Sequence, residues 1–117
     1  MRLKTAGLPI ADFRMYTVST DPNHLLGRPG QYISKVNFHD RRLTRSTSFA
    51  VSGGGSVETF ERTRDAERRF EYLRAVTDTS PLFGEYHYLE GRVILRLSFD
   101  LTPLQAKSYE DTFQRLL

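Results

Sequence analysis

Histidines are the first residues to test for metal binding or catalysis in this chain. His24, His39 and His87 share no local spacing, and a strand would point the neighbours His39 and Asp40 to opposite faces. The chain has no cysteine, which excludes disulfides, thiolate nucleophiles and cysteine-ligated metals. These residues therefore predict neither a metal site nor a bound cofactor.

The serines and carboxylates also lack a catalytic arrangement. No G-x-S-x-G sequence occurs, and "SGGGS" (52–56) leads into a predicted strand instead of the helix N-terminus that a phosphate-binding loop requires. Glu85 and Glu90 flank a predicted strand, where charged side chains are ordinarily solvated. We therefore expect no enzyme. A pocket with two carboxylates, or a serine in contact with a histidine, would instead support a small hydrolase.

The stretch "TDPNHLLGRPGQY" (20–32) is the most distinctive segment of the sequence. Its Asp21-Pro22-Asn23 is a type I turn signature, and Gly27 and Gly30 permit backbone angles that other residues resist. A stiff loop loses little conformational entropy on binding. The segment is therefore predicted to be a partner-binding loop.

Arginine and tyrosine are favoured at the centres of interfaces, and this loop supplies both. The alternative is that Leu25 and Leu26 fold back over the core while Arg28 pairs with a nearby carboxylate. The expected partner is a protein or a component of the cell envelope. The predicted contact residues are His24, Leu25, Arg28, Tyr32 and Lys35.

A basic and aromatic sheet face is the basis of a second hypothesis, the binding of single-stranded nucleic acid. Arginines beside tyrosines can clamp and stack bases. The aromatic-rich strand of the common RNA-binding fold is missing, and the net charge is only +3. The residues of this hypothesis are the cations Arg14, Lys35, Arg92 and Arg96 and the rings Tyr16, Tyr86 and Tyr88.

The elements that would position these residues follow from periodicity and turn signals. Alternation predicts strands over 12–19, 31–40 and 56–61 and a hairpin over 84–99. Apolar spacing predicts helices over 63–79, with Thr63 as the N-cap, and over 102–117, with a capping box from Thr102 and Gln105 and a proline at its first position. The segment 41–55 is predicted to be irregular, with strand character near 48–51, and "SGGGS" to be a flexible loop.

Length and composition predict one folded domain over residues 1–117. The chain is 38% hydrophobic and 26% charged, which is typical of a globular protein. The element order is partial helix-β-β-β-α-β-β-α. It predicts an α+β fold with a mainly antiparallel sheet of about five strands and two helices packed on one face. The other face of the sheet, with Arg14, Lys35, His87, Arg92 and Arg96, would be polar and available.

The start of the chain is typical of the end of a helix, because Gly7 and Pro9 follow Leu3 and Ala6 as a C-cap and a stop signal do. We therefore expect a domain trimmed of an N-terminal export or anchor segment and of part of a helix. No run approaches the roughly 18 apolar residues of a spanning helix, and no signal peptide is visible.

Several segments together resemble a group of small bacterial proteins, many of them predicted secreted lipoproteins, whose function is unassigned. They are "TDPNHLLGRPGQYISKVNF", "GGSVETF", "DAERRFEYL" and "GEYHYLEGRVILRLS", and the D-P-N…L-L-G-R-P part is the most specific. The resemblance implies an extracytoplasmic domain, membrane-anchored through an upstream lipid-modified cysteine. It implies no catalytic residues, and this chain lacks the signal and anchor cysteine of that pattern.

Overall fold

The structure, a computed structural model, describes residues 1–44, 49–80 and 84–117. Its centre is a five-stranded antiparallel sheet in the order β1-β2-β3-β5-β4, so the predicted α+β class and element order are confirmed. The strands are β1 (Ile10–Met15), β2 (Ser34–Asp40), β3 (Gly54–Thr59), β4 (Glu85–Glu90) and β5 (Val93–Ser98). The helices are α1 (Arg2–Thr5), the 3-10 turn η1 (Val51–Gly53), α2 (Thr63–Thr79) and α3 (Pro103–Leu116).

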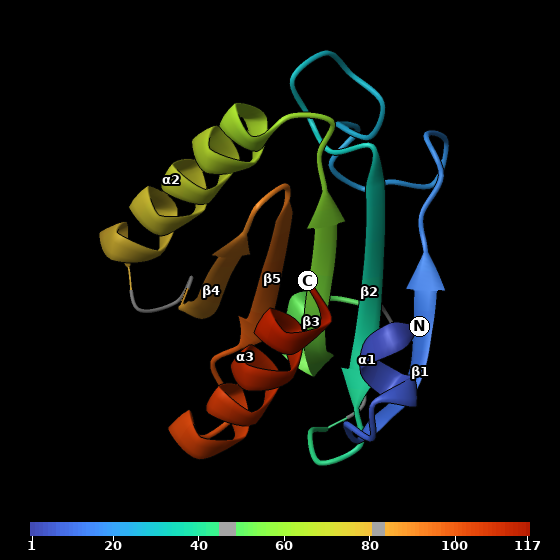
Figure 1. Cartoon of the computed structure of the whole chain (residues 1–117), viewed down its shortest axis with the longest axis vertical. Helices are drawn as coiled ribbons and strands as arrows, with labels where there is room; N and C mark the ends of the chain where they lie inside the picture. The colour runs from blue at the N-terminus through green and yellow to red at the C-terminus, as the bar shows by residue number, and fades with distance from the viewer. Residues whose placement is uncertain (45–48, 81–83) are drawn as a thin grey trace.

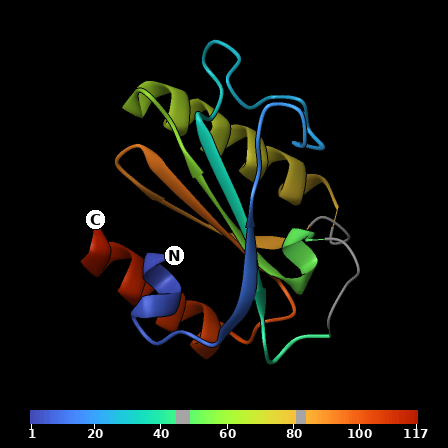
Figure 2. The same ribbon diagram turned by 90° about the vertical axis from the view of Figure 1, so that its right-hand side faces the viewer.

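The helices cover both faces of the sheet, which corrects the prediction that they pack on one face. Figures 1 and 2 show α1 and α3 on one side of the sheet and α2 on the other. On β5, Leu95 and Leu97 belong to the core beneath α3, whereas Ile94 belongs to a second core beneath α2. Tyr32 and Phe60, the large rings of this second core, were expected inside the strands over 31–40 and 56–61, but they lie just outside β2 and β3, where strand alternation does not predict the side that a ring faces.

The core beneath α3 is apolar and continuous. The rings of Phe38 and Tyr109 stack with centroids 5.6 Å apart, and the Tyr109 hydroxyl donates a 2.7 Å hydrogen bond to Asp40. The start of α3 is fixed by the predicted capping box, in which Thr102 accepts from the Gln105 amide and Gln105 accepts from the Thr102 amide. Helix α3 is therefore held at a defined position over the sheet.

The glycines of "SGGGS" are buried, Gly53 at the end of η1 and Gly54 and Gly55 in β3, so the prediction of a flexible loop there is wrong. A Cβ at Gly54 would collide with the backbone of β2, and a Cβ at Gly55 would collide with the Phe38 ring and the Arg96 carbonyl. Glycine is needed here because neighbouring strands and a core ring approach the backbone closely. Strand character begins at Gly54, later than expected near 48–51. Of that range residues 49–51 are described and residue 48 is not.

Candidate functional site

An ion cluster lies on the α2 side of the sheet, centred on the fully buried Glu58 of β3. The antiparallel register places Lys35 of β2 opposite Glu58, with its Nζ 2.8 Å from Oε2. Arg69 of α2 places Nε 3.0 Å from Oε1, and Arg96 of β5 places Nη1 3.0 Å from Oε2. One carboxylate thus joins basic side chains from three separate elements.

Glu85 of β4 extends this cluster to the edge of the sheet. It accepts hydrogen bonds from Nε and Nη2 of Arg96, both at 2.9 Å, which is the bidentate geometry of a strong arginine–carboxylate pair. His87, which faces Arg96 across the strand pair, places Nε2 3.0 Å from Glu85 Oε1. We call the set Lys35, Glu58, Arg69, Glu85, His87 and Arg96 the ion cluster.

The two carboxylates of the ion cluster stay ionised at neutral pH. Burial alone would raise the pKa of Glu58, but the charges of Lys35, Arg69 and Arg96 lower it to about 2. Burial likewise opposes ionisation of Glu85, and the hydrogen bonds from His87 and Arg96 outweigh it, so its pKa is also lowered. A carboxylate held in this state is a poor proton donor near neutral pH.

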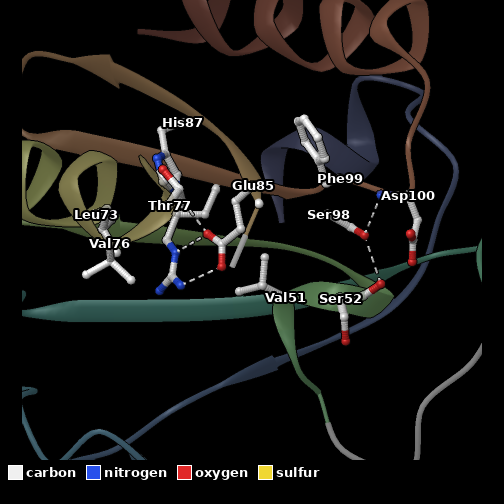
Figure 3. A pocket seen from close by; sticks show the side chains of 12 residues that line it. Val51, Ser52, Leu73, Val76, Thr77, Glu85, His87, Ser98, Phe99 and Asp100 are labelled. Atoms are coloured by element: carbon white, nitrogen blue, oxygen red, sulfur yellow. Dashed lines mark hydrogen bonds and ion pairs between the residues drawn. The ribbon is translucent and has the colours of Figure 1, made fainter. Parts of the chain in front are cut away.

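A cavity of about 560 Å³ opens between α2, the β4–β5 pair and η1 (Figure 3). This volume is within the range of small-molecule sites in proteins. Its walls are half polar, with Glu85, His87 and Arg96 on one side and Leu73 and Val76 of α2 on another. The other lining residues are Val51, Ser52, Thr77, Gly84, Ser98, Phe99 and Asp100.

A smaller cavity of about 310 Å³ lies on the other side of Arg96. Arg96 and Val51 line both cavities, so the two are neighbours separated by these side chains. Among the described residues that line the smaller cavity, two are basic and none carries a carboxylate. Its lining residues are Tyr16, Pro22, Asn23, Lys35, Asn37, Phe49, Ala50, Val51 and Arg96.

Asn37 of β2 forms part of the wall of the smaller cavity. Its Nδ2 donates to the Phe49 carbonyl, which also accepts a 3.4 Å hydrogen bond from the Tyr16 hydroxyl. Its Oδ1 is buried and has no hydrogen-bond partner among the described residues. Burying a carbonyl oxygen without a hydrogen bond costs about 1–3 kcal/mol of folding free energy, so a ligand that donates a hydrogen bond to this oxygen would recover part of that cost.

The predicted binding loop is anchored from beneath by the buried carboxylate of Asp21. Asp21 accepts hydrogen bonds from the amides of Asn23, Leu25 and Leu26 at 2.9–3.1 Å and from the Tyr32 hydroxyl at 2.7 Å. These bonds oppose the effect of burial, which would raise the pKa of Asp21, and the net shift is downward. The loop also reaches the site, because Asn23 lines the smaller cavity.

The predicted contact residues divide between the surface and the interior. Tyr32 is fully buried against Phe60, so it supports the loop and cannot itself contact a partner. Lys35 is 2% exposed and is reached only through the wall of the smaller cavity. Leu25 is half-buried and packs on the core beneath α2, as the alternative interpretation of the loop expects.

His24 and Arg28 are exposed at the surface of the loop. His24 adopts a left-handed backbone conformation with φ 55°. Within residues 1–44, 49–80 and 84–117, Arg28 forms no ion pair, so the carboxylate partner expected in the alternative interpretation is not found there. These two side chains are the part of the predicted contact set that a protein partner could reach directly.

The residues of the nucleic-acid hypothesis are also divided. Arg14, Lys35 and Arg96 share the α2 side of the sheet as predicted, since Arg14 pairs with Asn37 in the β1–β2 register. That face is not fully available, because α2 covers part of it. Tyr86 and Tyr88 pack against the core on the opposite face, so they cannot stack with bases beside those cations.

The central residues of the site, Glu58 and Arg69, were not singled out by sequence reasoning. Alternation in "SVETF" places Ser56 and Glu58 on the face opposite Val57, and this was the available signal for an inward-facing carboxylate. The partners of Glu58 come from β2, α2 and β5. Their convergence depends on the order of the strands in the sheet, which no local pattern in the sequence indicates.

In the described part of the chain, no group of three or more histidine, aspartate or glutamate side chains is placed to hold a metal ion. Over the same residues, no helix has the length and apolarity needed to cross a membrane. No protein-family model, curated protein or solved structure matches the chain.

Proposed function

We propose that this chain is a non-catalytic binding module that takes its ligand in the cleft formed by the two cavities on the α2 side of the sheet. The observation that carries the proposal is the pairing of an accessible cavity of about 560 Å³ with convergent polar groups whose pKa values are shifted. Such a combination is typical of binding sites. The half-apolar walls suit a ligand with both a polar and an apolar part.

The fixed geometry of the ion cluster supports binding over catalysis. Glu58 and Glu85 are each held by at least two hydrogen bonds from cationic or imidazole groups, so neither is free to exchange a proton with a substrate. A pre-paired site loses little side-chain entropy when a ligand arrives. The exposed His24 and Arg28, on the loop that borders the cleft, would add contacts if the ligand is part of a protein or of the cell envelope.

The test is a fragment screen by protein-detected NMR. Fragments that combine an apolar ring with a polar group should shift the signals of Leu73, Val76 and Thr77 in a saturable way. The variant Thr77→Arg should abolish these shifts by filling the cavity that Thr77 lines. Ala75→Arg is the matched control, because Ala75 is exposed on the same helix and does not line the cavity. Shifts that persist in Thr77→Arg would contradict the proposal.

The proposed location is outside the cytoplasm, in a protein anchored to the membrane upstream of this domain. The support for it is the likeness of the 20–32 segment to secreted lipoproteins. Cell fractionation of the full-length protein tests it, and recovery with cytosolic markers alone would contradict it.

Single-stranded nucleic acid is the second candidate ligand. Arg14, Lys35 and Arg96 on one face, with Tyr16 beside them, are the observation that favours it. This hypothesis predicts oligonucleotide affinity that falls steeply with salt. Absence of binding at low salt would remove it.

Catalysis by a small hydrolase is a third candidate, because Glu85 and Asp100 place two carboxylates on the larger cavity. Among the described residues that line it, neither Ser52 nor Ser98 is hydrogen-bonded to His87, and Ser98 donates instead to the Ser52 carbonyl. Hydrolysis of a model ester or glycoside that is lost in Asp100→Asn would support this candidate.

A further inference from the structure

We infer that the smaller cavity is a subsite for an oxyanion, the carboxylate or phosphate group of the ligand. This inference deepens the proposed function, since it names the chemistry of the group that the cleft would take beside Arg96.

The charges around the smaller cavity are unbalanced. Lys35 and Arg96 line it, whereas Glu58 is buried beneath them, and the described part of the wall holds no acidic side chain. Over the residues that the structure describes, the basic side chains of Lys35, Arg69 and Arg96 pair with two carboxylates, those of Glu58 and Glu85. Burial lowers the pKa of Lys35, and the charge of Glu58 opposes that shift. When Lys35 is protonated, the cluster carries an excess positive charge that an anion can neutralise in a partly water-excluded space.

The two cations also retain hydrogen-bond donors. Arg96 has five N–H donors and uses Nε, one on Nη1 and one on Nη2 in its bonds to Glu58 and Glu85. Lys35 has three N–H donors and uses two, toward Ser56 and Glu58. The remaining donors make no hydrogen bond to a described residue, although the Lys35 ammonium also lies over the Tyr32 ring, 5.2 Å from its centroid. An oxyanion in the cavity would supply acceptors for them, and arginine suits planar carboxylates and phosphates.

The uncharged part of the wall fits a ligand that continues beyond its anionic group. Tyr16 and Phe49 supply ring surface, and Asn23 presents an amide at the exposed loop side of the cavity. Asn37 carries the buried Oδ1 without a partner. A ligand with a hydroxyl or amide hydrogen next to its oxyanion would bring a donor to this side of the wall. The larger cavity, on the other side of Arg96, has room for the rest of the ligand.

The test is a titration with sodium phosphate and, separately, sodium acetate, followed by NMR of the Arg96 Nε–Hε group and the amides of Tyr16 and Asn37. Sodium chloride at equal ionic strength is the reference. We expect saturable shifts with a dissociation constant in the millimolar range for at least one oxyanion and none with chloride. Stronger binding of phosphate indicates a phosphorylated ligand, and stronger binding of acetate indicates a carboxylate ligand.

Three variants separate charge from structure. Asn23→Asp places a negative charge in the wall and should weaken oxyanion binding by about tenfold or more. Asn23→Ala loses the same 3.3 Å hydrogen bond to the Tyr32 hydroxyl without adding charge, so it should bind the oxyanion more tightly than Asn23→Asp does. Gln114→Glu, at an exposed position of α3, makes the same change in net charge far from the cavity and should leave binding unchanged.

The outcomes distinguish this inference from the proposed function. If neither oxyanion gives saturable shifts, or if Asn23→Asp binds as tightly as Asn23→Ala, the inference is overturned. Fragments that still bind beside Thr77 in that case would leave the proposed function standing. If neither oxyanions nor fragments bind, both are rejected.

Discussion

The two faces of the sheet are built on opposite principles. The face beneath α3 is filled mainly by apolar side chains, with Phe38, Leu97 and Phe113 at its centre, and the buried carboxylate of Asp40 lies at its edge, at the end of β2. The face beneath α2 has an apolar core at one end only, and at its centre it buries the charges of Glu58 and Lys35. Burial of apolar area favours folding. Burial of a charge opposes folding unless ion pairs and hydrogen bonds offset the cost of removing that charge from water.

This difference indicates which face serves stability and which serves recognition. A buried ion pair contributes little net stability compared with apolar side chains of the same volume. The face beneath α3 would therefore be sufficient to hold the sheet and helix together, while the face beneath α2 retains cavities and polar groups that packing alone does not require. Four measurements test whether the two faces differ in this way.

The largest effect is expected for Glu58→Gln. It removes the charge that Lys35, Arg69 and Arg96 share, and leaving buried cations without their partner typically costs about 3–5 kcal/mol. Urea denaturation at neutral pH measures the loss in the free energy of unfolding. Asp111→Asn, which breaks the exposed pair with Lys107, is the matched control and should change little. If both variants lose the same free energy of unfolding, the ion cluster contributes no more to stability than an exposed ion pair does.

A loss of about 2–5 kcal/mol is expected for Leu97→Ala on the opposite face. Leu97 is fully buried, so the substitution removes apolar contacts and leaves a cavity beneath α3. The same denaturation experiment measures it. The loss should not depend on pH between 7 and about 3, because no charge is involved. Leu104→Ala, at an exposed position of α3, is the control.

The pH dependence of unfolding should be concentrated on the α2 face. The pKa of Glu58 is lowered from 4.5 to about 2, so the stability it contributes is complete above pH 4.5 and is lost as the pH falls toward 2. We expect the wild type and Leu97→Ala to lose stability in parallel over this range. Glu58→Gln should show a flatter profile, and a profile as steep as the wild type's would assign the dependence to Asp21, Asp40 or Glu85 instead.

The smallest effect, about 1 kcal/mol, is expected for Tyr32→Phe. The variant keeps the ring against Phe60 but removes the 2.7 Å hydrogen bond to Asp21. Asp21 accepts hydrogen bonds from the amides of Leu25 and Leu26. The hydrogens of these amides should then exchange faster with deuterated water than in the wild type. Tyr72→Phe at an exposed position is the control. Unchanged hydrogen exchange at Leu25 and Leu26 would show that the Tyr32 hydroxyl is not needed to hold the loop in place.

The elements with strong local signals were predictable from the sequence. The helix over 63–79 matches α2, and the capping box at Thr102 marks the start of α3. Alternation in β5 correctly assigned Leu95 and Arg96 to opposite faces. In the α2 helix, Thr63 was expected as the N-cap, but Arg62 occupies that position without a side-chain cap. Helix boundaries commonly shift by a residue, because the cap depends on the local backbone path.

The arrangement around the site was less predictable, because it depends on contacts between distant segments. The glycines at 54 and 55 have the composition of a linker, and only the approach of Phe38 shows that they belong in a strand. Lys35 was assigned to a binding surface, yet its role follows from the burial of Glu58 across the strand pair. A carboxylate and a lysine far apart in sequence give no local sign that they will meet.

The position of Arg96 between the two cavities has a consequence for cooperativity. A molecule that draws the guanidinium toward one cavity changes the donors presented to the other, and such coupling is reciprocal by thermodynamic linkage. Two fragments that bind on either side of Arg96 would therefore influence each other's affinity. A compound that links the two fragments around the Arg96 side chain would bind more tightly than either fragment, because binding of its first half raises the effective concentration of the second.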